Sequence, residues 1–206
     1  MKKTNNKGFS LVELIIVIAI MAILAGAIAP ALIKYIDKSR KSNDVSSAKT
    51  IKTAVETALG TESVYEYLTG GSGDYSYVYV IPGEETSSGN PGAKAVKIGW
   101  GDGSAPTDKI NGKDPADIEK VAVEQIAANI GEKTPKLKYR KNAGDEKSSA
   151  TPEEFVAVIS KKGTVYVYIS VVADQGFTVP LDGDEPKSAD DAVGFQICPN
   201  ICDEYN

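Results

Sequence analysis

The chain has 206 residues, enough for one compact domain of about 150 residues and one additional element. It carries 23 Lys+Arg against 28 Asp+Glu, a formal net charge of −5, so it lacks the excess of positive charge with which proteins bind nucleic acid regardless of sequence. Histidine is absent, which excludes Ser-His-Asp and Cys-His catalytic groups and histidine-liganded zinc. Two cysteines cannot form a four-thiolate metal site.

The first 33 residues hold nearly all the consecutive hydrophobicity of the chain. Lys2, Lys3 and Lys7 precede residues 11–33, a stretch in which Glu13 is the single charge. As a helix this stretch is about 35 Å long, enough to cross a hydrocarbon core of about 30 Å. Positive charge before a span is retained in the cytoplasm. The sequence therefore predicts one membrane span, with a short leader inside and the remaining chain outside.

Two simpler interpretations fit the same stretch. One is a removed secretory signal peptide with a small-residue cleavage site at 27–29, and the other is a plain single-span anchor. Neither accounts for Glu13, because a carboxylate inside a membrane segment costs about 2.5–3.5 kcal/mol on insertion scales. A carboxylate at such a place suggests a function.

Residues 7–13, KGFSLVE, closely resemble the cleavage and methylation motif of type IV pilins and pseudopilins, and the similarity continues without a gap through Tyr35. The resemblance implies that a prepilin peptidase cuts after Gly8 and N-methylates Phe9. It also implies that Glu13 of an incoming subunit pairs with the Phe9 amine of the subunit at the base of a growing fibre. A Phe9–Glu13 pair within one chain is the alternative.

The resemblance divides the chain into a leader of residues 1–8, a helix half of residues 9–33 and a head of residues 34–206. The helix half lies first in the membrane and later in the core of the fibre. Within it Gly26 and Pro30 predict a kink or local melting, because Pro30 has no N–H and crowds the carbonyl of Gly26.

Beyond the span, apolar residues recur at helical spacing at Ala48, Ile51, Val55 and Ala58/Leu59. This pattern predicts that one helix runs from Phe9 to about Leu59 and lays one face of its second half on a sheet. Further along, aromatic and β-branched runs predict four strands, and an apolar face between capping residues predicts a second helix. The strands are expected at 75–81, 94–100, 154–160 and 164–172, and the helix at 115–130. The predicted fold class is α+β, with a long helix against an antiparallel sheet, which is the pilin roll.

Two weaker signals lie near the carboxyl end. Cys198 and Cys202 could form a disulfide in an oxidising exterior, although the disulfide loop of many pilins is much longer. Asp182, Asp184 and Asp190 are a weak calcium candidate, and a solvated acidic turn is the favoured interpretation. No other metal and no cofactor is expected.

The predicted function is structural rather than enzymatic. The resemblance implies a major pilin that polymerises into an extracellular type IV pilus for adhesion, twitching motility or biofilm formation. The implied partners are further copies of the chain, minor pilins, the prepilin peptidase/N-methyltransferase, the assembly platform with its ATPase, and the membrane before assembly. The alternatives are a pseudopilin of a type II secretion or DNA-uptake system, a minor pilin, and, outside the family, a single-span exported enzyme or binding protein.

Overall fold

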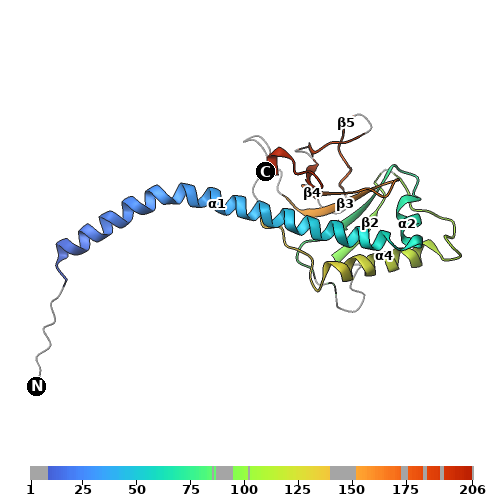
Figure 1. Cartoon of the computed structure of the whole chain (residues 1–206), viewed down its shortest axis with the longest axis horizontal. Coiled ribbons are helices and arrows are strands. Elements are labelled where there is room, and N and C mark those ends of the chain that lie inside the picture. Colours follow the sequence, from blue (N-terminus) through green and yellow to red (C-terminus); the bar gives the residue numbers. More distant parts are fainter. Residues whose placement is uncertain are drawn as a thin grey trace, which may run out of the picture. The chain divides into compact units, whose positions relative to one another are not determined.

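The computed structural model describes residues 9–84, 86, 95–101, 103–139, 152–172, 176–182, 185–190 and 193–205. The chain divides into two units, Met1–Ser39 and Arg40–Asn206. The first contributes the amino-terminal part of helix α1, and the second is the head, which holds the remaining elements (Figure 1).

Helix α1 (Leu11–Leu59) has 49 residues and is continuous through Gly26 and Pro30. It begins two residues later than predicted, because Phe9 and Ser10 precede the first helical residue. Its carboxyl end is the predicted one, since the chain turns at Gly60 immediately after Leu59.

The head is built on one six-stranded antiparallel sheet in the order β2-β1-β3-β4-β8-β7. Its strands are β1 (Tyr75–Val80), β2 (Val96–Gly99), β3 (Glu154–Ser160), β4 (Val165–Ser170), β7 (Ala189–Asp190) and β8 (Gly194–Cys198). A separate two-stranded pair is formed by β5 (Leu181–Asp182) and β6 (Glu185–Pro186). The four predicted strands are confirmed to within two residues at each end.

Two helices and one 3-10 turn complete the part of the head that the structure describes. Helix α4 (Pro115–Ile130) has both predicted ends, with Pro115 in its first turn and Gly131 after its last residue. The N-cap residue of α4, Asp114, makes no side-chain capping bond and pairs instead with Lys109, 3.4 Å from Nζ to Oδ1. Helix α2 (Glu62–Thr69) and the turn η1 (Asp203–Tyr205) were not predicted.

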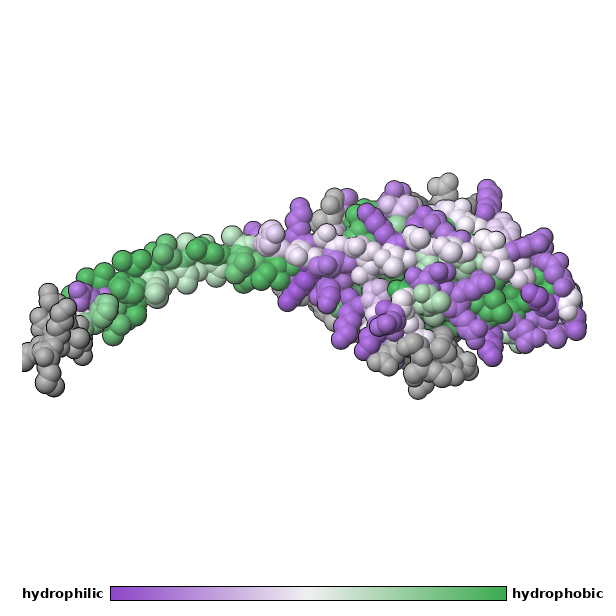
Figure 2. Space-filling view, turned by 60° about the horizontal axis from the view of Figure 1, so that its bottom comes forward, coloured by the Kyte–Doolittle hydropathy of each residue, from purple (hydrophilic) through white to green (hydrophobic). Residues whose placement is uncertain are grey.

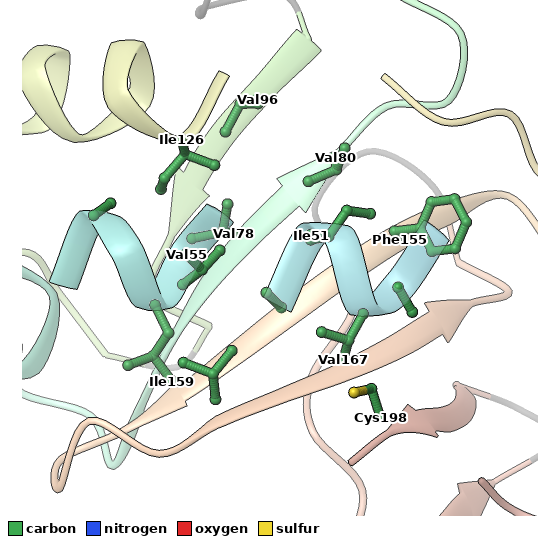
Figure 3. Close-up of a cluster of buried hydrophobic side chains, with 14 of the residues drawn as sticks. Ile51, Val55, Val78, Val80, Val96, Ile126, Phe155, Ile159, Val167 and Cys198 are labelled. Atoms are coloured by element: carbon green, nitrogen blue, oxygen red, sulfur yellow. The ribbon is translucent and has the colours of Figure 1, made fainter. Parts of the chain in front are cut away.

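The main core lies between the second half of α1 and one face of the sheet, with α4 on that same face (Figures 1 and 3). The helical period of the apolar residues places them in one row that points toward the sheet. That row is Val45, Ala48, Ile51, Ala54, Val55 and Ala58, all buried. Figure 3 shows Ile51 and Val55 directed toward side chains of β1, β3 and β4. The predicted packing of α1 on the sheet is confirmed.

The opposite face of the sheet carries a second, smaller cluster rich in tyrosine. It consists of Tyr77, Tyr79, Val156, Val158, Tyr168, Phe177 and Val179. The Tyr79 hydroxyl donates to the carbonyl of Phe177 at 3.1 Å, and that of Tyr168 to the carbonyl of Lys187 at 2.9 Å. Because each buried hydroxyl has a hydrogen-bond acceptor, sheet packing accounts for these aromatic residues.

Candidate assembly site

The amino-terminal part of α1 is an exposed apolar surface. Every residue from Phe9 to Ile36 is exposed, and Figure 2 shows this part of the helix as a nearly continuous hydrophobic surface. In the described part of the chain α1 is long and apolar enough to cross a membrane, and none of its most apolar stretch is buried. Burying 14 large aliphatic side chains at about 1.5–3 kcal/mol each yields about 20–40 kcal/mol. Water is therefore an unfavourable surrounding for this segment, and lipid or other apolar helices are favourable ones.

The first turn of α1 is closed by the side chain of Glu13. The backbone N–H of Ser10 donates to Oε2 of Glu13 at 2.9 Å, and that of Leu14 donates to the carbonyl of Ser10 at 3.2 Å. Ser10 and Glu13 thus occupy the N-cap and N3 positions of a capping box. The carboxylate also lies at the positive end of the helix dipole. Glu13 therefore stabilises the start of its own helix, a role that the spacing Ser-x-x-Glu could have predicted.

Phe9 immediately precedes this cap, with 87% of its surface exposed. Gly8 and the rest of the leader lie outside the described residues. In the uncleaved chain the nitrogen of Phe9 is part of the peptide bond to Gly8, so it carries no charge that could pair with Glu13. Cleavage after Gly8, methylation of Phe9 and the pairing of Phe9 with Glu13 stay predictions.

The predicted interruption at Gly26 and Pro30 does not end the helix, because α1 continues for 29 residues beyond Pro30. A Cβ added to Gly26 would have no neighbouring atom within 4 Å. Neither a packing contact nor a close approach therefore accounts for the glycine in the isolated chain. The kink at this point stays a prediction.

A buried carboxylate in the head connects three distant segments. Asp44 of α1 accepts hydrogen bonds from the backbone N–H of Lys138 at 2.8 Å and of Tyr139 at 2.9 Å, and from the Tyr205 hydroxyl at 3.4 Å. Burial raises the pKa of Asp44, while these hydrogen bonds act to lower it. Lys41 lies 5.2 and 5.8 Å from the ring centroids of Tyr139 and Tyr205. We name Lys41, Asp44, Lys138, Tyr139 and Tyr205 the Asp44 cluster.

The Asp44 cluster holds the part of α1 where the head begins. It joins α1 to the segment after α4 and to the carboxyl-terminal turn η1. The hydrogen-bond partners of Asp44 lie 94, 95 and 161 positions away along the chain. No local pattern marks such a residue.

The structure has Cys198 and Cys202 as buried thiols, and a disulfide between them stays a prediction. Burial raises the pKa of the Cys198 thiol, against the smaller effect of nearby Lys52 and Lys49. The thiol form is therefore favoured at Cys198 in this surrounding.

The calcium candidate falls largely outside the described part of the chain. Asp184 is not described, and of Asp182 and Asp190 the structure describes the strands but not the side chains. Among the side chains that are described, no three His, Cys, Asp or Glu residues gather into a metal-binding group.

Comparison of the sequence with known proteins identifies the family of this chain. Residues 3–29 match the family model described as the prokaryotic N-terminal methylation motif. A type IV major fimbrial protein FimA of Dichelobacter nodosus is 33% identical over 127 residues, covering 53% of this chain and 74% of that protein. Another FimA of this organism is 44% identical over 57 residues, 28% of this chain and 36% of that protein. Fimbrial protein Q of Moraxella bovis is 51% identical over 54 residues, 26% of this chain and 34% of that protein.

The shorter matches cover only about a third of the length of these relatives, whereas the longer ones cover more than two thirds. No solved structure matches the chain. The methylation motif, the exposed apolar helix and the α+β head lie in one chain together with similarity over most of a fimbrial protein. The chain belongs to the type IV pilin family.

Proposed function

We propose that the chain is a major pilin, the structural subunit of an extracellular type IV pilus. The observation that carries this proposal is the exposed apolar helix attached to a head with its own complete core. Lipid covers residues 11–33 before assembly, and the same segment of neighbouring subunits covers them in the fibre. Because both surroundings bury the same side chains, transfer from one to the other costs little hydrophobic free energy.

Processing precedes assembly in this proposal. A prepilin peptidase cuts after Gly8 on the cytoplasmic side and methylates the new amine of Phe9, which stays basic after methylation. The mature subunit then lies in the cytoplasmic membrane with its head outside. The assembly platform and its ATPase move it into the fibre, where it meets further copies and minor pilins.

Glu13 sets the position of each incoming subunit. Its capping hydrogen bond holds the carboxylate in the first turn of the helix, where a neighbour's terminal amine can approach it. Two unit charges 4 Å apart attract by about 4 kcal/mol at an effective dielectric constant of 20. This attraction offsets much of the cost of keeping either charge in an apolar core.

In this role the chain is a polymer subunit rather than an enzyme. The fibre extends from the cell surface and serves adhesion, twitching motility or biofilm formation. The fimbrial names of its relatives support this role.

Substitution of Glu13 tests the proposal, because two variants separate its charge from its cap. Glu13→Gln keeps a side-chain acceptor for the Ser10 N–H but removes the charge, and Glu13→Val removes both. We expect that both variants insert into the membrane and lose their leader normally, and that neither forms filaments. Electron microscopy of sheared surface material, labelled with antibody against the head, measures the filaments.

The matched control is Glu124→Gln, which removes an exposed carboxylate from α4. It should assemble like the unchanged protein. Normal filaments from Glu13→Gln would restrict Glu13 to helix capping, and sheared filaments that lack this chain would contradict the proposed function.

A further inference from the structure

Two lysines follow the apolar segment of α1 directly. Lys34 and Lys38 are one helical turn apart, so they extend from the same side of the helix, and both are exposed. The ion pairs of the described residues involve neither of them. Asp37, the carboxylate between them, is only partly exposed. The helix therefore presents two ammonium groups to its surroundings at this level.

The position of these lysines relative to the span determines what they meet. At a rise of 1.5 Å per residue, Lys34 and Lys38 lie about 1.5 Å and 7.5 Å beyond Ile33 along the helix axis. The headgroup layer on one side of a bilayer is about 5–7.5 Å thick. When the helix spans a membrane with Ile33 at the edge of the hydrocarbon, both ammonium groups therefore reach the level of the lipid phosphates.

Tyr35 supports the same depth. Its side chain is 73% exposed and lies between the two lysines in the sequence. Tyrosine at the end of a span places its ring in the interfacial layer, where one end is apolar and the other is hydrated. Lysine stems likewise lie along apolar surface while their charged ends reach the headgroups.

Lys41, further along the helix, makes its contacts within the head instead. Lys41 lies over the rings of Tyr139 and Tyr205 within the head. We name Lys34, Tyr35 and Lys38 the headgroup collar, after the lipid layer that they reach. They precede Lys41 in the sequence, where the contacts within the head begin.

We propose that the headgroup collar binds the phosphates of anionic phospholipids in the outer leaflet while the subunit waits in the membrane. This proposal rests on the proposed function, since it needs the helix to span a bilayer. It goes beyond that function by naming a lipid class and the residues that select it. Leaving the membrane then requires that the two lysines exchange lipid phosphates for contacts in the fibre.

The test is lipid selectivity of the full chain reconstituted in phosphatidylcholine vesicles. Electron paramagnetic resonance of spin-labelled lipids gives the association of phosphatidylglycerol relative to phosphatidylcholine at the protein surface. We expect Lys34→Gln alone to lower this ratio about fivefold, and Lys34→Gln combined with Lys38→Gln to lower it further. Salt should lower the ratio of the unchanged chain. Lys113→Gln, an exposed lysine of the head, is the matched control and should leave the ratio unchanged.

Flotation with the vesicles is measured on the same samples and separates the two proposals. A chain that floats, with equal selectivity before and after removal of both lysines, overturns the collar and leaves the pilin function intact. An equal loss in Lys113→Gln overturns it as well, because the effect would then come from overall charge. A chain that does not associate with vesicles contradicts the proposed function itself, and the collar with it.

Discussion

At the scale of single residues, the structure changes the interpretation of Glu13. From the sequence it is an uncompensated charge within an apolar span. In the structure its carboxylate accepts a hydrogen bond from the Ser10 N–H; Glu13 lies in the first turn of the helix, and Ser10 is its N-cap. A hydrogen-bonded carboxylate at the end of a span costs less than one at its centre. This position lowers the cost of the carboxylate in a membrane, and under the proposed function a neighbour's Phe9 amine offsets the remainder.

The buried Asp44 gives the head a defined dependence on pH. Burial raises its folded-state pKa above the ordinary carboxyl value, which is near 4. The folded head then binds more protons than the unfolded chain between these two pKa values, so the contribution of Asp44 to stability is complete below pH 4 and is lost as the pH rises through the raised pKa. We predict that the free energy of unfolding of the unchanged chain, relative to Asp44→Asn, increases from pH 7 to pH 4.

Urea unfolding of the full chain in detergent micelles at a series of pH values measures this difference. At every pH we expect Asp44→Asn to be less stable by about 1–3 kcal/mol, because an amide cannot accept from both backbone N–H groups of residues 138 and 139. A difference that shrinks on acidification would show that the hydrogen bonds dominate and lower the folded-state pKa.

At the scale of elements, the sequence predicted the helix and strand ends that neighbouring residues determine. Helix α4 and strand β3 have their expected ends, because proline and glycine bound α4 and a β-branched run ends at the turn before Gly163. Gly163 has a φ of 75°, and a Cβ there would lie 2.7 Å from Cε2 of Tyr65. Glycine is required at this turn for both reasons.

The missed elements are short and depend on distant partners. Helix α2 has eight residues, too few for a strong periodic pattern, and it is held to α4 by the Tyr67 hydroxyl, which donates to Glu119 at 2.7 Å. The strands β5, β6 and β7 have two residues each. Strand β8 is buried along its whole length and lies between β4 and β7, so only the assembled sheet defines it.

Pro30 can be tested within its own helical turn. Pro30→Ala restores an N–H that can donate to the carbonyl of Gly26, and a proline inside a helix costs about 3 kcal/mol. We predict that amide hydrogen exchange in residues 26–31 of the chain in detergent micelles slows by about tenfold or more, as measured by NMR.

Gly26→Ala is the control for that experiment. It also adds a better helix former to the same turn, with open space for the new Cβ, but it restores no hydrogen bond. If Gly26→Ala slows exchange as much as Pro30→Ala, helix propensity rather than the missing hydrogen bond determines the local stability.

At the scale of the whole molecule, the candidate assembly site was predictable because its chemistry is continuous in sequence. The leader motif, the span and Glu13 lie within the first 33 residues. The Asp44 cluster was not predictable, because it joins residues up to 161 positions apart. The head needs long-range contacts to form, whereas the amino-terminal helix carries its function in local composition.

The exposed apolar half of α1 is the feature on which the proposed function depends. A helical reconstruction of filaments purified from cells, at a resolution that shows side chains, tests it most directly. We predict that residues 11–33 of each subunit pack against the same residues of its neighbours, with the Glu13 carboxylate about 4 Å from the Phe9 amine of an adjacent subunit. Filaments joined only through contacts among heads, with residues 11–33 exposed or absent, would contradict the account.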